Sequence, residues 1–275
     1  MTVTSSIPAR VIPNVLTIAG SDPSGGAGIQ ADLKSFSALG AYGSSVITAL
    51  TAQNTRGVTG VHPVPAEFIA AQLETLLDDV RIDAVKIGMV ASREVAEVIR
   101  AALTRRRPRW VVLDPVMVAK SGDILVDDAG IRAVREVLVP LADLITPNLP
   151  EAAVLLDAPA PGSRNEMQAL ASALRALGAG ATLLKGGHLA GEECPDLLIT
   201  ADEALWVEGA RVDTANLHGT GCTLSSAITA RLALGDALPE AVARAKRWLG
   251  EALEASRRLD VGEGRGPVHH FHAWW

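Results

Sequence analysis

The chain has 275 residues, 48% of them hydrophobic, which is enough to bury a large core in one or two α/β units. Its formal net charge of −6 and the absence of a basic tail argue against broad electrostatic binding to nucleic acid or to an anionic membrane. The first residues lack the apolar run of a signal peptide, and no stretch approaches the roughly 18 uncharged apolar residues of a membrane helix. We therefore expect a cytoplasmic protein.

The cysteine content and the linker pattern are also informative. Two cysteines, Cys194 and Cys222, are too few for a disulfide framework or a four-thiolate zinc site, so a reducing compartment fits the sequence. No linker rich in Pro, Ser or Gly and no internal repeat divides the chain. We expect a flexible N-terminal extension over residues 1–13 and a single domain over residues 14–275.

Short apolar runs alternate with amphipathic stretches along the chain, which predicts an α/β fold of parallel strands joined by crossover helices. The predicted strands are 15–20, 44–52, 83–90, 109–118, 143–148 and 181–187. The predicted helices are 28–39, 65–80, 92–106, 127–139, 166–177, 222–234 and 239–259. Segment 197–213 contains two β-like runs around an acidic Ala-Asp-Glu, which predicts an antiparallel hairpin at an edge of the sheet.

Glycine and polar residues follow several of the predicted strands. The segments in question are GSDPSGGAGIQAD, DPVMVAKSGD, TPNLPE and KGGH, and HGTGC comes near the end of the chain. Ligands of open α/β sheets bind outside the carboxyl ends of the strands, where such loops converge. The sequence therefore predicts a ligand site at that edge of the sheet.

The first glycine-rich loop allows more than one interpretation. Gly26, Gly28 and Ala31 match the dinucleotide fingerprint G-x-G-x-x-A, which favours an NAD-dependent oxidoreductase. That fingerprint also needs an acidic residue about 20 positions later to hold the ribose, and segment 33–66 contains no Asp or Glu. A plain turn is the alternative, but Asp32 early in the next helix indicates a ligand with hydrogen-bond donors. The sequence contains no Walker A motif.

The segment HGTGC, residues 218–222, precedes an apolar stretch that predicts a helix. Backbone N–H groups at a helix N-terminus favour an anion, so we expect an anion hole formed by Gly219, Thr220, Gly221 and Cys222. The alternative is a tight loop whose cysteine is packed as a small apolar residue. A helix N-terminus lowers the pKa of a thiol, so we expect Cys222 to ionise near neutral pH.

Four further polar residues lie at the ends of predicted strands: Asp114, Asn148, Glu151 and Lys185. Each one separately fits a helix cap or a salt-bridged surface group. Together they provide carboxylate oxygens for Mg²⁺ or its waters, an amide for phosphate and a cation for developing charge. This combination is typical of phosphoryl transfer.

With these residues assembled, the chain resembles the hydroxymethylpyrimidine/phosphomethylpyrimidine kinases of thiamine biosynthesis, within the ribokinase-like superfamily. The resemblance runs from about Val15 to the C-terminus and rests on ordered motifs that include LTIAGSDPSGGAGIQADLKSFSALGAYG, VITALTAQNTRGV, KIGMV, VVLDPVMVAKSGD, LITPNLPEA, LLKGGH, HGTGCTLSSAI and GPVHHFH. It implies a three-layer α-β-α sandwich with a few antiparallel edge strands. It also implies ATP-dependent phosphorylation of 4-amino-5-hydroxymethyl-2-methylpyrimidine and then of its monophosphate, and it suggests a homodimer.

The resemblance also implies roles for individual residues. A pyrimidine pocket would be lined by Gly20, Asp32, Gln53, Met89 and Val116. ATP and Mg²⁺ would be bound through Asp114, Asn148, Glu151 and Lys185, with Asp114 and Glu151 reaching Mg²⁺ through water and phosphate. Cys222 would stand at the catalytic-base position, where most sugar kinases of the superfamily carry an aspartate. A neutral thiol would repel the monophosphate of the second step less than a carboxylate does, which is a hypothesis about substrate choice.

Three alternatives stay open at this point. A pyridoxal kinase acts on a ring that also carries a hydroxymethyl group. An NAD-dependent oxidoreductase would use the first glycine-rich loop. A non-catalytic pyrimidine-binding protein would share the scaffold without the chemistry, although the presence of Cys222, Lys185, Asn148 and Glu151 argues against it.

Overall fold

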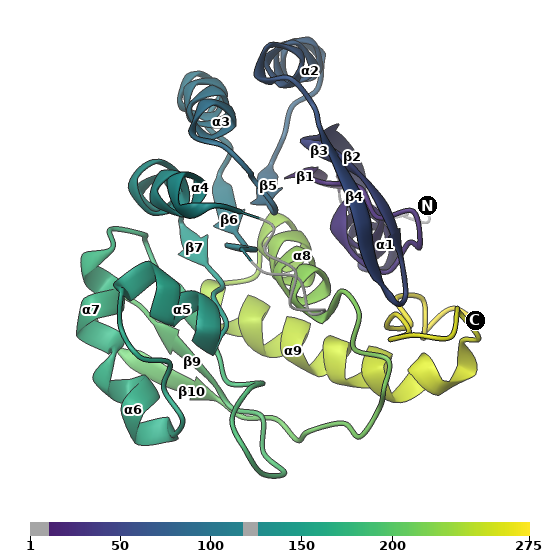
Figure 1. Cartoon of the computed structure of the whole chain (residues 1–275), viewed down its shortest axis with the longest axis vertical. Coiled ribbons are helices and arrows are strands. Elements are labelled where there is room, and N and C mark those ends of the chain that lie inside the picture. The colour runs from purple at the N-terminus through teal and green to yellow at the C-terminus, as the bar shows by residue number, and fades with distance from the viewer. Residues whose placement is uncertain (1–10, 118–125) are drawn as a thin grey trace, which may run out of the picture.

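The computed structural model describes residues 11–117 and 126–275. Most of the predicted N-terminal extension, residues 1–10, lies outside the described residues, and so does the second half of DPVMVAKSGD. Within the described ranges, eight strands form one sheet with helices on both of its faces (Figure 1). This arrangement confirms the predicted three-layer α/β fold.

The strand order across the sheet is β10-β9-β8-β7-β6-β5-β1-β2. The strands are β1 (Asn14–Ala19), β2 (Tyr42–Ile47), β5 (Ala84–Ile87), β6 (Trp110–Leu113), β7 (Leu144–Ile145), β8 (Thr182–Lys185), β9 (Asp196–Ile199) and β10 (Ala204–Val207). The pairs from β2 through to β8 are parallel, whereas β9 is antiparallel to both β8 and β10. The predicted hairpin at the sheet edge is thereby confirmed.

Alternate side chains of the strands pack into different helical layers. Val111 and Leu113 of β6 pack with one layer, and Val112 between them packs with the other. The first layer contains α2 (Ala66–Asp79), α3 (Arg93–Arg105), α4 (Asp128–Ala133), α5 (Leu149–Leu156), α6 (Arg164–Ala169) and α7 (Ala171–Ala176). The second contains α1 (Gly28–Ala38), α8 (Thr220–Ala233) and α9 (Leu238–Ala255). Helices α1 and α8 of the second layer and α5 of the first layer begin at the carboxyl edge of the sheet.

The predicted strand 44–52 is in fact two strands in two sheets. The first part is β2, whereas β3 (Ala49–Asn54) pairs antiparallel with β4 (Gly57–Pro63) in a separate two-stranded sheet. The break falls at Thr48, whose N–H donates to the Ala19 carbonyl at 2.9 Å and whose hydroxyl donates to the Met89 carbonyl at 2.9 Å. These bonds end the main sheet there, and the β3–β4 hairpin extends beyond it toward the C-terminal segment (Figure 1).

The segment after β7 also differs from the prediction, which had no helix there. Asn148 is the N-cap of α5, and its side chain accepts a hydrogen bond from the Glu151 N–H at 2.8 Å. The Glu151 carboxylate in turn accepts from the Asn148 N–H at 2.8 Å, which completes a capping box. None of the helices in the described ranges has the length and apolar character needed to cross a bilayer.

Candidate active site

A cleft of about 2070 Å³ lies over the carboxyl ends of the parallel strands. We call its two ends the hairpin end, beside β3–β4, and the α9 end, beside β10 and α9. Nearly all of the predicted site residues line this cleft: Gly20, Gln53, Met89, Asp114, Val116, Asn148, Glu151, Lys185, Gly219, Thr220, Gly221 and Cys222. Asp32 is the exception. Residues from seven or more segments far apart in the sequence thus meet in one space, as the topology predicts.

The loop before α8 needs glycine for steric reasons. Gly219 has a φ of 74°, and a Cβ placed on it would lie 1.7 Å from the Gly26 carbonyl oxygen. Gly28, at the start of α1, has a φ of 54° and faces the Gly20 carbonyl in the same way, at 2.3 Å. The two glycine-rich loops therefore touch backbone to backbone. Only glycine allows this approach, which brings the first turns of α1 and α8 together at the cleft.

A polar contact that the sequence analysis missed joins the same two loops. The Asp22 carboxylate accepts hydrogen bonds from the backbone N–H groups of Ser24, Gly26 and Ala27 at 2.8 to 3.1 Å, and lies 2.7 Å from the His218 Nε2 atom. Burial opposes ionisation of Asp22, but His218 and the other donors outweigh it and lower the pKa to about 2. No spacing rule links residues this far apart in the sequence, so only the fold could bring them together.

The centre of the cleft contains a lysine between two carboxylates. Lys185, at the end of β8, lies 2.9 Å from an Asp114 carboxylate oxygen and 3.9 Å from a Glu151 carboxylate oxygen. Burial opposes ionisation of Asp114, but Lys185 and Lys86 outweigh it and hold the pKa of Asp114 below its usual value. For Glu151 the balance is reversed: burial raises the pKa to about 7, although Lys185 opposes that shift. Asp114 is therefore ionised at neutral pH, whereas Glu151 gains or loses its proton near neutral pH.

The hairpin end combines apolar walls with amide groups. The Met89 methyl group lies 2.8 Å from where a Cβ on Gly20 would be, so the thioether packs over the bare backbone of Gly20. Gln53 enters from β3 just after a β-bulge, and its side-chain oxygen accepts a hydrogen bond from the Thr51 hydroxyl at 3.2 Å. Val116 lines the same end. These residues offer a flat apolar slot with a polar edge, which suits a small aromatic heterocycle.

A C-terminal strap, residues 262–267, ties the hairpin end to the loop before α8. The Arg265 N–H donates to the Thr55 carbonyl at 2.9 Å, and the Gly264 N–H donates to the Thr55 hydroxyl at 3.1 Å, both at the tip of the hairpin. At its other end the Gly266 carbonyl accepts from the His218 N–H at 3.0 Å. The strap was not predicted. It connects the tip of the β3–β4 hairpin with the loop before α8.

Asp32 was expected in the pyrimidine pocket, and its position is a correction. Its carboxylate is fully buried between the sheet and α8, where it accepts hydrogen bonds from Thr17, Lys86 and Ser226 at 2.6 to 3.0 Å. These hydrogen bonds occupy both carboxylate oxygens, and Asp32 does not line the cleft. Lys86, which the sequence analysis did not single out, lines the cleft in its place.

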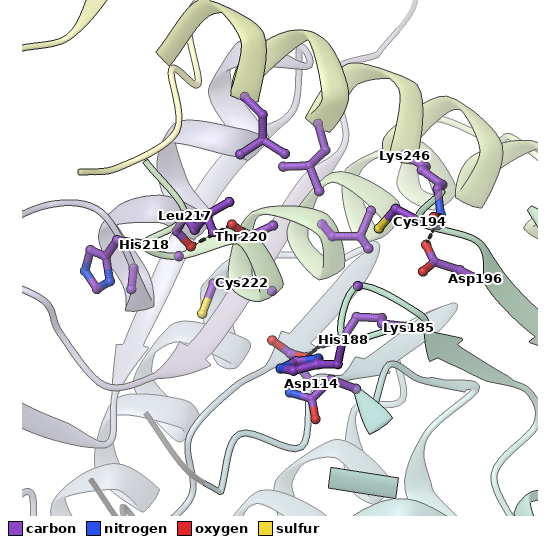
Figure 2. Close-up of a pocket in the computed structure, with 18 of the residues that line it drawn as sticks. Asp114, Lys185, His188, Cys194, Asp196, Leu217, His218, Thr220, Cys222 and Lys246 are labelled. Carbon is purple, nitrogen blue, oxygen red and sulfur yellow. Dashed lines mark hydrogen bonds and ion pairs between the residues drawn. The ribbon is translucent and has the colours of Figure 1, made fainter. Parts of the chain in front are cut away.

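The expectation of a low pKa for Cys222 is also wrong. The thiol projects from the first turn of α8 toward the cleft (Figure 2), and the Gly28 N–H donates to its sulfur. Burial raises the pKa of Cys222 to about 11, with Lys86 opposing the shift and the carboxylates of Asp32 and Asp114 adding to it. The favourable field at the helix N-terminus is therefore outweighed, and the thiol is neutral at neutral pH.

The residues in the centre of the cleft suit a hydrated magnesium ion better than a dehydrated metal. Asp114 and Glu151 provide carboxylate oxygens, and a Cβ on Gly221 would lie 3.6 Å from the second Asp114 oxygen. No group of three or more His, Cys, Asp or Glu ligands occurs within residues 11–117 and 126–275. Magnesium is commonly held by one or two carboxylates together with water and substrate phosphates, and this donor set fits that pattern.

Comparison with known proteins identifies the family. The sequence profile described as phosphomethylpyrimidine kinase matches residues 22–269. The chain belongs to the phosphomethylpyrimidine kinase family. A hydroxymethylpyrimidine/phosphomethylpyrimidine kinase of Salmonella typhimurium is 55% identical over 262 residues, which cover 95% of this chain and 98% of the relative.

Solved structures extend the comparison. The crystal structure of phosphomethylpyrimidine kinase from Clostridium difficile is similar with a TM-score of 0.77 and 44% identity, covering 87% of this chain and 99% of that one. An ADP complex of Bacillus subtilis pyridoxal kinase is similar with a TM-score of 0.88 and 36% identity, covering 96% and 99%. Membership of this kinase family makes the chain a phosphotransferase, and it removes the dehydrogenase interpretation of the first glycine-rich loop.

Proposed function

We propose that this phosphomethylpyrimidine kinase family member transfers the γ-phosphoryl group of ATP to the hydroxymethyl group of 4-amino-5-hydroxymethyl-2-methylpyrimidine. It then transfers a second phosphoryl group to the resulting monophosphate, as thiamine diphosphate biosynthesis requires. The observation that carries the proposal is one continuous cleft that joins a heterocycle-sized apolar end to the charged group of Asp114, Glu151 and Lys185. Acceptor and phosphoryl donor would therefore bind in the same cleft.

Each part of the cleft has a role in this reaction. Gln53 binds the aminopyrimidine edge as donor and acceptor, while Gly20, Met89 and Val116 cover the faces of the ring. The first N–H groups of α8, in residues 219–222, bind the charge that develops on the transferred phosphoryl oxygens. Lys185 contacts the phosphates beside these N–H groups, since a Cβ on Gly221 would lie 3.4 Å from its ammonium. Asn148 holds Glu151 in place through the capping box. Positioning and charge stabilisation supply most of the rate enhancement, because the transition state is loose.

The phosphoryl donor and its cation occupy the centre and the α9 end of the cleft. The ADP complex of the related pyridoxal kinase supports nucleotide binding by a protein of this fold. Asp114 and Glu151 would hold Mg²⁺ through water and phosphate, and the ion would neutralise charge on the phosphates of the donor. Cys222 contacts the acceptor hydroxymethyl group. Because its thiol is neutral at neutral pH, it receives the acceptor proton only through its minor thiolate form, late in the transfer, when bond formation to phosphorus has already acidified that hydroxyl.

A product assay tests this proposal directly. The full-length protein is incubated with ATP, Mg²⁺ and hydroxymethylpyrimidine, and the products are identified by mass. We expect monophosphate first and diphosphate later, with ADP formed in equal amounts. ATP consumption without any phosphorylated pyrimidine would overturn the proposal.

Pyridoxal is the second candidate substrate, because the structural similarity to a pyridoxal kinase has the higher TM-score, 0.88 against 0.77. The sequence identity favours the pyrimidine, with 55% to the Salmonella kinase against 36% to the pyridoxal kinase. Comparing kcat/KM for the two acceptors decides between them. We expect the pyrimidine to be preferred, and a preference for pyridoxal would reverse the assignment.

We also propose a homodimer in the cytoplasm. The biosynthetic role of the related enzymes supports the location, and the family resemblance supports the dimer. Analytical ultracentrifugation of the full-length protein tests the assembly. A species of one chain mass at micromolar concentration would overturn it.

A further inference from the structure

The first glycine-rich loop is tied to the strand that carries Gln53. The Ser21 N–H donates to the Ala49 carbonyl at 2.9 Å, and the Ser21 carbonyl accepts from the Thr51 hydroxyl at 2.9 Å. Both partners lie in β3, as does Gln53. Asp22, the next residue of the loop, is therefore held on the acceptor side of the cleft.

His218 belongs to the phosphate side, because it directly precedes the anion hole of residues 219–222. A Cβ on Gly26 would lie 2.3 Å from the His218 Cδ2 atom, so the ring packs on a backbone that has to be bare. The ring lies well apart from Asp114 and Lys185 (Figure 2). His218 is thus placed to orient its loop and not to act on the phosphates.

One hydrogen bond connects the two sides. An Asp22 carboxylate oxygen lies 2.7 Å from the His218 Nε2 atom, and the two side chains are 2% and 15% exposed. Although burial opposes ionisation, hydrogen bonds lower the pKa of Asp22 to about 2, so the carboxylate can only accept and Nε2 carries a hydrogen. The N–H groups of Ser24, Gly26 and Ala27 also donate to this carboxylate and fix it in its own loop.

The hydrogen bond adds something that the backbone contact between the loops does not. The contact of Gly219 with Gly26 sets how closely the loops approach. A hydrogen bond is directional and weakens steeply when its angle changes, so it also sets how the loops are oriented. The Asp22–His218 bond therefore orients residues 219–222 relative to the loop that begins at Gly20.

We propose that Asp22 and His218 are positioning residues for phosphoryl transfer, because their hydrogen bond holds the anion hole of residues 219–222 in alignment with the bound acceptor. The inference rests on the proposed function. In the transfer, the acceptor oxygen bonds to the γ-phosphorus, the bond from that phosphorus to the ADP oxygen breaks with its electron pair left on ADP, and the acceptor proton leaves by way of Cys222. Asp22 and His218 exchange no protons with the substrates.

Steady-state kinetics of the full-length protein tests this role, with whichever acceptor the parent phosphorylates, the pyrimidine or pyridoxal. His218→Phe keeps a flat ring against Gly26 but loses the donor. Asp22→Ser keeps a short acceptor for its own loop but does not reach His218. Each should lower kcat by about 10- to 100-fold and change the KM of acceptor and ATP by less than about threefold, because alignment is lost and binding is not.

A conservative variant and a double variant separate positioning from a general loss of structure. His218→Gln places an amide N–H near the Nε2 position and should keep kcat within about threefold of the parent. Asp22→Ser/His218→Phe should lose about as much kcat as one single variant, because both changes remove the same contact. Losses that multiply, an unchanged kcat, or KM values that rise in step with the fall in kcat overturn the inference. If His218→Phe fails to fold, Asp22→Ser and His218→Gln decide the test.

Ser24→Ala is the matched control. The Ser24 hydroxyl donates to the other Asp22 oxygen at 2.7 Å, and Ser24 is not among the residues that line the cleft. This variant removes a hydrogen bond from the same carboxylate but leaves the bond between the loops intact. Its kcat should stay within about twofold of the parent.

Amide hydrogen exchange without substrate distinguishes failure of this inference from failure of the proposed function. His218→Phe should exchange faster than the parent, by about threefold or more, both in segment 22–28 and in segment 218–224. Ser24→Ala should leave segment 218–224 unchanged. Equal exchange in His218→Phe and the parent overturns the inference, whereas a parent that phosphorylates neither acceptor counts against the proposed function.

Discussion

Lys185 and Asp114 form an ion pair of 2.9 Å that reaches across the end of β7, from the last residue of β8 to the residue after β6. The Thr146 hydroxyl, which follows β7, donates to the same Asp114 oxygen at 2.9 Å. Three neighbouring strands therefore fix one carboxylate and one ammonium at the centre of the cleft. A phosphate bound there meets a cation whose position is already set, so little reorganisation accompanies transfer.

Replacing Lys185 by methionine should lower kcat by about 10²- to 10³-fold, the usual cost of removing one charge-stabilising group from a transition state. The KM for the pyrimidine should change by less than about threefold, because Lys185 is assigned to the phosphates and Gln53 and Met89 to the pyrimidine ring. Steady-state kinetics with each substrate varied measures both effects. Lys34→Met, which removes a half-buried lysine of α1 that does not line the cleft, should keep kcat near the wild-type value. A loss of less than tenfold in Lys185→Met contradicts the role.

Glu151 should make the protein less stable as the pH rises. Its pKa in the folded state is raised from 4.5 to about 7, so its contribution is complete below about pH 4.5 and is lost as the pH rises through 7. Between pH 5 and pH 8 this amounts to about 2 kcal/mol of unfolding free energy. Glu151→Gln keeps an acceptor for the Asn148 N–H but cannot ionise, so its stability should fall less over this range. Urea unfolding at both pH values measures the difference, and equal slopes in the two proteins would refute it.

The layers of the fold could be predicted from the sequence, because alternation of strand and helix leaves few topologies. The points within a segment where one strand ends and the next begins could not be predicted. Segment 44–52 consists of apolar and hydroxyl-bearing residues with no Gly, Pro or charge, and nothing local marks Thr48 as the point where the chain leaves the main sheet. Its partners are the carbonyl of Ala19, at the end of β1, and the carbonyl of Met89, in the segment after β5.

The candidate site was predicted where short motifs carry the chemistry, and missed where long-range pairs do. Lys86 is one of four residues in a short buried strand, and its partner Asp32 lies 54 residues away in the sequence. Asn148 and Glu151 were predicted either as functional residues or as helix caps. In the structure they form the capping box of α5, and this arrangement also directs the Glu151 carboxylate toward Lys185. For Cys222 the sequence showed only the helix N-terminus, which lowers the pKa of a thiol. It did not show the burial of the side chain, which raises that pKa by more.

The strap can be tested at Gly264. A Cβ on Gly264 would lie 2.2 Å from the Thr55 carbonyl oxygen, so Gly264→Ala must push the strap away from the hairpin tip. We expect a KM for the pyrimidine raised by about tenfold and a loss of roughly 1–2 kcal/mol in unfolding free energy. Gly57→Ala is the matched control, because a Cβ there meets no atom within 4 Å and the residue lies in the same hairpin. If both variants behave alike in the kinetic assay, the strap does not position the hairpin.

Cys222→Asp should impair the second phosphorylation more than the first. The thiol is neutral at neutral pH because its pKa is about 11, and Asp114 already places a negative charge nearby. A new carboxylate would repel the acceptor of the second step, which carries a phosphate, and would repel the uncharged hydroxymethylpyrimidine far less. At an effective dielectric constant near 20, one added charge at about 6 Å costs roughly 3 kcal/mol before screening, so a further loss of about tenfold or more is expected.

The two steps are assayed separately in that experiment, one starting from the pyrimidine alcohol and one from its monophosphate. Cys222→Ser is the control, because serine is nearly isosteric and neutral and should reduce both rates by a similar factor. Equal losses in both steps for Cys222→Asp would mean that the charge at this position does not discriminate between the acceptors. A greater loss in the second step, absent from Cys222→Ser, would mean that the neutral thiol is what lets one cleft accept both an alcohol and a phosphate.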